Sequence, residues 1–310
     1  MTIKAASRAG LAAALTFLTV CAVAQEAQPP KTIEEAYPGL LSGALSTATL
    51  ADLPPGVLVL LSKEDIRKET LDGILAKSPS KLRAQLEQNS LFLVEELATK
   101  RLLFRAASEA AQEKGLNLEG KAEPDIIADY LQNLVAEVTV SEAEIADFYR
   151  LNRSMFEGAA LEKVRESLTL YLRKKKRQEI VDRYVRGLGG KYAAKVSAPW
   201  LREQAARAMD NPVDKGRSSG KVTFVDFGAE SCKACKMMKP VLESLAKKYA
   251  GKANVLFVHV QNDPVLATRF GIGSIPVQVF FDKDGKEVLR HEGFYPQDEI
   301  ERKLAELGVK

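Results

Sequence analysis

The sequence predicts a protein of two domains, a mainly helical domain followed by an α/β domain. Apolar residues recur at helical spacing over residues 37–209, whereas from residue 221 onward short apolar runs alternate with amphipathic segments. The stretch 210–220 between them combines a proline, two glycines and polar residues, which is typical of a linker. A chain of 310 residues is long enough for two domains of ordinary size.

Residues 1–24 have the form of a secretory signal peptide. Lys4 and Arg8 precede an apolar run, and a small-x-small cleavage signal ends at Ala24. We therefore expect cleavage near Ala24, a periplasmic or secreted mature protein and no stable membrane span, because the run is too short to cross a bilayer. An uncleaved anchor and lipidation of Cys21 are the alternatives.

Composition and charge narrow the class of protein. With 46% hydrophobic and 28% charged residues, the chain matches soluble globular proteins rather than disordered or fibrous ones. Removal of the two basic residues of the signal peptide lowers the formal net charge from +4 to +2. A protein so close to neutral gives no reason to expect a nucleic-acid partner.

The helical region can be divided by its start and stop signals. Residues 25–36 are polar with two prolines and are predicted to be a leader. The helical domain, 37–209, then contains an apolar strand at 57–61 and a set of leucines at helical spacing that ends at Gly115. Pro124 suits the first turn of the next helix.

The second part of this domain contains the clearest local signal. Ser141 and Glu144 form a capping box at the start of a helix. A long helix is then predicted over 159–186, ended by the glycine-rich residues 187–190. Within it, residues 173–177 are all basic; we interpret them as a solvated helix face, with a site for an acidic partner as the alternative.

The α/β domain, 221–310, has the order βαβαββα. Turn signals and periodicity predict strands at 222–227, 255–260, 277–281 and 287–291, and helices reaching 249, near 265–270 and from 297.

Cys232 and Cys235 follow the first of these strands and open the next helix. A strand leading to two cysteines at a helix start predicts a dithiol–disulfide redox site. Half of a zinc site is the alternative, but the only further candidates are Cys21, His259 and His291, without a zinc-binding spacing. We therefore expect no metal and no other cofactor. After export only two cysteines remain, which favours a catalytic dithiol over a structural bridge.

The helix position predicts different roles for the two thiols. Cys232 lies first on the helix, where the positive end of the helix dipole and unpaired amides favour its thiolate. It is therefore the expected nucleophile. Cys235, one turn inside, is the expected resolving thiol, and Lys233 adds positive potential beside the nucleophile.

The α/β domain resembles the thioredoxin family over essentially all of residues 221–310. The residues that carry the resemblance, in family order, are Phe224 to Phe227, Cys232 to Met237, Pro240, Phe270 to Ile272, Ser274 to Pro276 and Gly293. The resemblance implies a thioredoxin fold, thiol–disulfide oxidoreductase activity on protein disulfides and a role in cell redox homeostasis.

The resemblance also implies two further site features. Ile275 and Pro276 are expected to be joined by a cis bond that leaves the preceding backbone free to bind an incoming peptide; an ordinary trans turn is the alternative. Asp226 is expected to be a buried carboxylate with a raised pKa that takes the proton of Cys235. The alternative is an Asp that bonds a neighbouring amide at a strand end.

Three departures from the family pattern concern the substrate groove. Gly228 and Ser231 stand where thioredoxins usually have tryptophans, and Phe257 stands where a lysine is common. The groove is thus less aromatic, and the dipeptide between the cysteines leaves the direction of electron flow open.

The helical domain resembles the chaperone part of the SurA/PpiD family. The segments that carry this resemblance are 53–66, 138–149 and 191–196. Residues 156–158 pass straight to the final helix, so the parvulin module of that family is missing and we expect no prolyl isomerase activity.

Together these features predict an exported thiol–disulfide oxidoreductase whose helical domain binds clients or dimerises. The expected partners are unfolded or misoxidised proteins and a redox partner protein. One alternative is a periplasmic chaperone whose thioredoxin domain only docks onto partners. A second is a homodimer in which the helices set the geometry of an isomerase.

Overall fold

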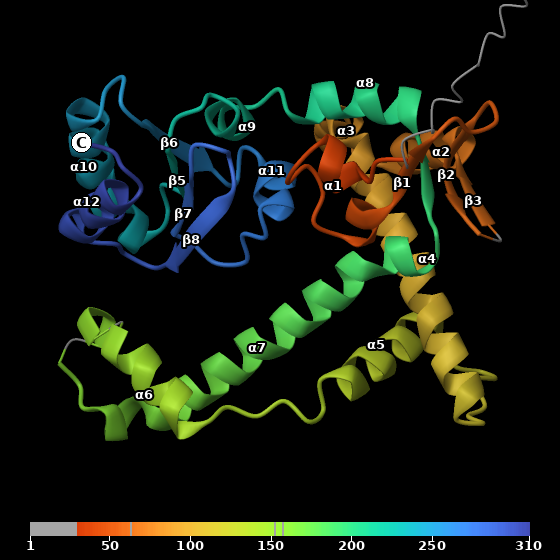
Figure 1. Ribbon diagram of the computed structural model, residues 1–310, viewed down its shortest axis with the longest axis horizontal. Coiled ribbons are helices and arrows are strands. Elements are labelled where there is room, and N and C mark those ends of the chain that lie inside the picture. Colours follow the sequence, from red (N-terminus) through yellow and green to blue (C-terminus); the bar gives the residue numbers. More distant parts are fainter. Residues whose placement is uncertain (1–29, 63, 152, 157) are drawn as a thin grey trace, which may run out of the picture.

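The computed structural model describes residues 30–310 except 63, 152 and 157. The predicted signal peptide lies outside the described residues. Figure 1 shows a helical domain on one side and an α/β domain on the other, joined along one edge by α8 (Ala198–Ala208) and α9 (Pro212–Arg217). The predicted fold class, a mainly helical domain followed by a thioredoxin-like α/β domain, is confirmed.

A small sheet holds the two sequence ends of the helical domain together. Its order is β1-β4-β2-β3, with β1 (Thr49–Ala51) parallel to β4 (Lys195–Ser197) and β2 (Val57–Leu61) antiparallel to both β4 and β3 (Glu64–Arg67). The strand predicted at 57–61 is confirmed. Since β4 closes the domain and β1 opens it, this pairing brings the ends of a region of about 150 residues into one core.

The helices of this domain pack on that sheet or extend away from it. They are α2 (Lys68–Lys77), α3 (Ser80–Gln88), α4 (Ser90–Glu113), α5 (Glu123–Leu134), α6 (Glu142–Leu151) and α7 (Leu161–Lys191), with short 3₁₀ turns η1 (Ala44–Thr47) and η2 (Arg153–Phe156). α4 crosses the core and buries Leu91, Val94 and Leu102. In Figure 1, α7 extends obliquely from this core, and α6 lies against its far end.

The predicted signals at helix ends are confirmed. Gly115, with φ +65°, follows α4, and Pro124 lies in the first turn of α5. At the start of α6 the backbone N–H of Glu144 donates to the Ser141 hydroxyl over 3.3 Å, and the Ser141 N–H donates back to the Glu144 carboxylate over 2.8 Å. This capping box satisfies donors that a helix start otherwise leaves free.

The prediction of a leader over 25–36 is wrong for its described part. Thr32 caps the short helix α1 (Ile33–Ala36) in a capping box with Glu35, and Thr32 bridges to Thr49 of β1. Ile33 is completely buried in the helical core. Burial of one isoleucine therefore anchors a segment whose composition is that of a loop.

The predicted end of the long helix at residues 187–190 is also wrong, because α7 continues to Lys191. The glycines allow a close approach to η1 instead: a Cβ on Gly189 would lie 2.2 Å from the carbonyl oxygen of Ala44. Thr47 joins the two elements, donating to the Arg186 carbonyl over 2.7 Å and accepting from the Gly190 N–H over 2.9 Å. This packing offsets the low helix propensity of glycine.

The α/β domain has the predicted order βαβαββα. Its elements are β5 (Thr223–Gly228), α10 (Lys233–Lys248), β6 (Asn254–His259), α11 (Pro264–Arg269), β7 (Val277–Phe281), β8 (Glu287–Glu292) and α12 (Gln297–Glu306). The sheet order is β6-β5-β7-β8, with β5 parallel to β6 and the other neighbours antiparallel.

Helices cover both faces of this sheet, so its central strands are buried throughout. Phe224 and Phe280 pack with α10 and α12 on one face, and Val225 and Phe227 pack with α9 and α11 on the other. Because side chains alternate along a strand, Asp226 shares the α10 face with Phe224.

The segment predicted as a linker, 210–220, is instead folded onto the α/β domain. Asn211 caps α9 by accepting from the N–H groups of Val213 and Asp214. The Asp214 carboxylate is buried and binds the guanidinium groups of Arg217 and Arg269. A buried ion pair needs this full set of partners, and it fixes the segment in place.

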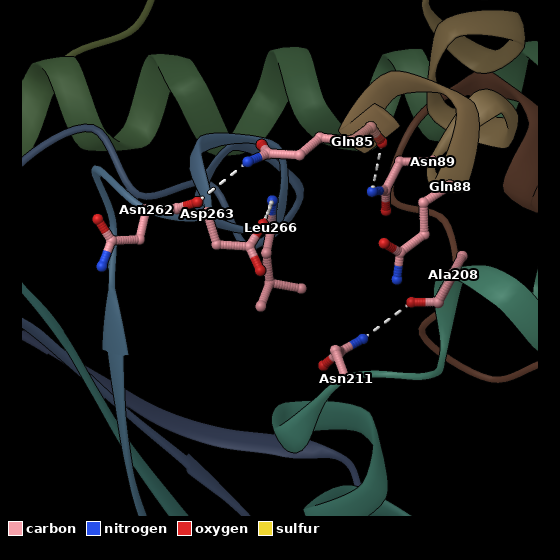
Figure 2. Close-up of a pocket in the computed structure, with 8 residues that line it drawn as sticks. All are labelled: Gln85, Gln88, Asn89, Ala208, Asn211, Asn262, Asp263 and Leu266. Carbon is pink, nitrogen blue, oxygen red and sulfur yellow. Dashed lines mark hydrogen bonds between the residues drawn. The ribbon is translucent and has the colours of Figure 1, made fainter. Parts of the chain in front are cut away.

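A small number of side-chain contacts join the two domains. Arg269 lies over the ring of Phe92 of α4, with its guanidinium carbon 5.2 Å from the ring centre, and Arg217 donates to the Gly39 carbonyl over 3.3 Å. Gln85 of α3 donates to the Asn262 carbonyl over 3.0 Å, beside a pocket of about 220 Å³ (Figure 2). Figure 2 shows carboxamide side chains from both domains around this pocket. The domains therefore meet through a few polar and cation–π contacts around this pocket.

The helices were also compared with the length and hydropathy of membrane-spanning helices. Over 30–310, apart from the three positions left out, no helix has the length and apolar character needed to span a bilayer.

Candidate functional site

The two cysteines lie where β5 leads into α10, as predicted. Cys232 is the N-cap residue of α10, and its sulfur accepts a hydrogen bond from the Cys235 N–H over 3.2 Å. The same sulfur lies 3.8 Å from the carbonyl oxygen of Ile275. Cys232 is partly accessible, whereas Cys235 is only 6% exposed. An incoming disulfide can therefore reach Cys232 but not Cys235.

The surroundings separate the acidities of the two thiols. Burial opposes ionisation of Cys232, but hydrogen bonds from the Cys235 thiol and from the amides of Cys235 and Ala234 outweigh it and lower the pKa of Cys232. Burial, followed by the hydrogen bond to Cys232, raises the pKa of Cys235 to about 11. Cys232 is thus the thiol that ionises first as pH rises.

The loop before β7 forms the wall of the site opposite the helix. The bond between Ile275 and Pro276 is cis, as the sequence resemblance implied. The Pro276 carbonyl accepts from the Gly293 N–H over 2.8 Å, and the Ser274 hydroxyl donates to the Glu292 carboxylate over 3.1 Å. These bonds tie the loop to β8 and place the Ile275 carbonyl against the nucleophilic sulfur.

Asp226 lies in the middle of β5 and is completely buried. Burial raises the pKa of its carboxyl to about 6, and a hydrogen bond from Gln278 lowers it in part. The negative charge of Asp226 also raises the pKa of both Cys232 and Cys235. Asp226 therefore does bond a neighbouring amide, as the alternative proposed, but the amide is the Gln278 side chain on β7, and Asp226 lies within the strand rather than at its end.

Two of the departures from the family pattern lie against each other here. A Cβ on Gly228 would lie 3.0 Å from the ring of Phe257 and 3.3 Å from the Cys235 sulfur. Phe257 itself is 48% exposed. Glycine at 228 thus allows the Phe257 ring to approach the dithiol, and a larger residue would displace one of them.

Sequence reasoning missed Gln278, whose Nε2 donates to Asp226 Oδ1 over 2.7 Å. The available signal was a single amide in an otherwise apolar strand. His259 and His291, considered as zinc ligands, form no group with the cysteines. In the described ranges no set of three or more His, Cys, Asp or Glu side chains is placed to hold a metal ion.

Comparison with known proteins agrees with this geometry. Residues 209–308 match the family described as "Thioredoxin-like domain". Thioredoxin of Staphylococcus saprophyticus is 43% identical over 94 residues, which are 30% of this chain and 88% of that protein. Through this domain the chain belongs to the thioredoxin family. Thioredoxin of Staphylococcus haemolyticus is 42% identical over the same shares of the two chains.

Among solved structures, chloroplastic thioredoxin z is 27% identical, with 37% of this chain and 93% of that chain covered, at a TM-score of 0.29. The family match moves the start of the thioredoxin-like domain from the predicted residue 221 to 209, so that α9 belongs to it. Membership supports a thiol–disulfide oxidoreductase type of function. The resemblance of the helical domain to SurA/PpiD chaperones stays a prediction.

Proposed function

We propose that this protein is an exported thiol–disulfide oxidoreductase that acts on the disulfides of unfolded or misoxidised proteins through Cys232 and Cys235. The observation that carries the proposal is the partly accessible sulfur of Cys232 at the N-cap of α10. This sulfur accepts a hydrogen bond from the Cys235 N–H and lies against the Ile275 carbonyl oxygen. Hydrogen bonds to the sulfur stabilise the thiolate, which is the form that attacks a disulfide. Export to the periplasm rests on the pattern of residues 1–24.

The reductive direction proceeds in two balanced steps. The Cys232 thiolate attacks one sulfur of a client disulfide, forms a mixed disulfide and releases the other client sulfur as a thiolate. Cys235 then loses its proton to Asp226 and attacks the Cys232 sulfur. This step forms the Cys232–Cys235 disulfide and releases the second client thiolate. A redox partner protein reduces the pair again; the reverse sequence oxidises a client.

The test is equilibration of the full mature chain with glutathione, together with turnover of insulin disulfides. We expect catalysed insulin reduction and a single two-electron couple. A potential near that of thioredoxins, about −270 mV, would indicate a reductant, and one near about −120 mV an oxidant. The proposal would be contradicted if both the reduction and the oxidation of insulin proceeded at the uncatalysed rate.

Apolar side chains on α7 support the proposed client-binding role of the helical domain. Leu170 is 59% exposed and Tyr171 is 41% exposed, and both belong to α7, which runs obliquely below the thioredoxin-like domain in Figure 1. Burial, and next the carboxylate of Glu292, raises the pKa of the Tyr171 hydroxyl, so this surface lies within electrostatic reach of β8. Glu292 binds Ser274, next to the Ile275–Pro276 bond. A client held there would lie close to the dithiol.

A groove at the domain junction offers a second apolar surface for clients. It has a volume of about 660 Å³ and lies between α3, α4 and α11. Its apolar lining is formed by Leu82, Leu86, Phe92, Leu93, Leu103, Ile127 and Val265. Exposed apolar surfaces of this kind also favour the second candidate function, a chaperone whose thioredoxin-like domain only docks onto partners. In a third candidate function, the helical domain joins two copies of the chain as a homodimer.

Replacing both Leu170 and Tyr171 with aspartate is expected to slow turnover of a large unfolded disulfide protein by about tenfold, because burial of these side chains against the client is lost. Turnover of a small disulfide such as oxidised glutathione should be unchanged. Leu116→Asp is the matched control, since Leu116 is 60% exposed but lies at the turn between α4 and α5.

Competition kinetics with the two substrate sizes measure this effect. If the double variant processes large clients as fast as the wild type, the α7 surface does not hold clients. Equal losses for the α7 variant and the Leu116 control would mean that any added charge has this effect.

A further inference from the structure

Gln278 and Asp226 form an isolated polar pair inside the sheet. They lie directly opposite each other in the antiparallel pairing of β7 and β5, and both side chains are completely buried. Gln278 Nε2 donates to Asp226 Oδ1 over 2.7 Å. The other two polar atoms, Asp226 Oδ2 and Gln278 Oε1, are buried without a hydrogen-bond partner in the described part of the chain. A buried polar atom without a partner calls for an explanation, and a redox or catalytic role is one such explanation.

The groups that face this pair come from three elements. From α10, Cys232 and Cys235 feel the charge of Asp226. Phe257 of β6 stands opposite Asp226 on its other side and offers no polar atom. His291 of β8 stands opposite Gln278; burial lowers the pKa of this histidine, and its Nε2 lies 3.2 Å from the Phe294 carbonyl. Among the residues that the structure describes, no cation offsets the charge of Asp226, and the Gln278 side-chain amide is its hydrogen-bond donor.

We propose that Gln278 is a positioning residue for the proton transfer at the dithiol: it holds Oδ1 of Asp226, so that Oδ2 is left to accept the proton of Cys235. This inference rests on the proposed function of the dithiol. In the step concerned, the Cys235 S–H bond breaks and its proton goes to Asp226. The Cys235 electron pair then forms the bond to Cys232, and the client sulfur leaves with the electrons of the mixed disulfide.

The amide also sets the pH range in which this base works. A hydrogen bond donated to a carboxylate favours its ionised form, whereas burial disfavours it. Gln278 offsets part of the burial effect without introducing a second charge, so Asp226 can ionise close to neutral pH. Without the amide, burial alone remains and the carboxyl should hold its proton to higher pH.

The test is the pH dependence of mixed-disulfide resolution, measured in single turnovers with the full chain. Gln278→Leu keeps the size of the side chain but removes both polar atoms. In this variant the acid side of the pH profile should move to higher pH by about one unit, so that resolution there is about tenfold slower at a given pH. At high pH, where Asp226 is ionised in both proteins, the rate of resolution and the alkylation rate of Cys232 should stay at the wild-type values. Gln278→Met serves the same purpose if the leucine variant does not fold.

Two further variants complete the design. Asp226→Asn should remove the acid limb from the pH profile of mixed-disulfide resolution. His291→Asn should leave this limb at its wild-type pH. An unchanged limb in both Gln278 variants, or a limb that disappears with His291, would overturn the assignment. These outcomes differ from failure of the proposed function, in which the wild-type chain would resolve no mixed disulfide at any pH.

Discussion

Replacing Cys232 with serine is expected to abolish disulfide exchange, whereas Cys235→Ser is expected to stop the reaction halfway. Cys232 is the accessible thiol with the lowered pKa, and a serine hydroxyl cannot form a disulfide. With Cys235 replaced, Cys232 still attacks, but no second thiol releases the client. Insulin turnover should fall to the uncatalysed rate in both variants, and only Cys235→Ser should accumulate a covalent adduct with clients on non-reducing gels.

The adduct is the decisive readout, because loss of turnover alone does not distinguish the two roles. Iodoacetamide labelling of the reduced wild type should modify Cys232 first near neutral pH, since burial raises the pKa of Cys235 to about 11. An adduct that forms in Cys232→Ser instead would exchange the roles of nucleophile and resolving thiol. Thermal unfolding of each variant controls for damage to the fold.

Asp214→Ala is expected to lower the free energy of unfolding by about 3–5 kcal/mol, because it leaves two buried arginines without their counter-ion. The Asp214 side chain is 2% exposed, and those of Arg269 and Arg217 are 4% and 12% exposed. Arg269 Nη2 donates to Asp214 Oδ1 over 3.0 Å, and Arg217 Nη1 donates to the same oxygen over 3.1 Å. Urea unfolding followed by circular dichroism measures the loss.

Asp210→Ala is the matched control for this change. Asp210 lies four residues earlier and pairs with Lys215, but both side chains are 66% exposed, so the loss should stay below about 1 kcal/mol. Because Arg269 and Arg217 also contact the helical domain, the Asp214 variant should unfold in two separated steps. A small, single-step effect like that of Asp210 would show that the cluster neither stabilises the thioredoxin-like domain nor joins it to the helices.

The thioredoxin-like domain was predictable because its signals are local. The strand at 277–281 was predicted at its exact bounds, and the helix after the dithiol to within a residue. Alternation of apolar runs, a cysteine pair at a helix start and an Ile-Pro pair each restrict the backbone over a few residues. Local signals of this kind identify Cys232 and Cys235, whereas the roles of Asp226 and Pro276 come from the resemblance to the thioredoxin family.

Gln278 was missed because a single amide in a strand has no partner visible in the sequence. Its function depends on being opposite Asp226, which is 52 residues away along the chain. The Asp214 cluster was missed for the same reason, since Arg269 is 55 residues away. Composition suggested a linker at this segment, whereas a buried ion pair made it part of the domain.

By itself the sequence determined the order of elements in the α/β domain, the capping box of Ser141 and Glu144 and the position of the dithiol, because each depends on interactions between residues a few positions apart. Only the tertiary structure decided that α7 continues through its glycines, that Ile33 is anchored in the core and that residues 210–220 fold onto the thioredoxin-like domain. In each case the deciding free energy comes from contacts between distant segments. Burial of Ile33, the close approach of Gly189 to Ala44 and the neutralisation of Asp214 outweigh the local preference for a loop or a helix end.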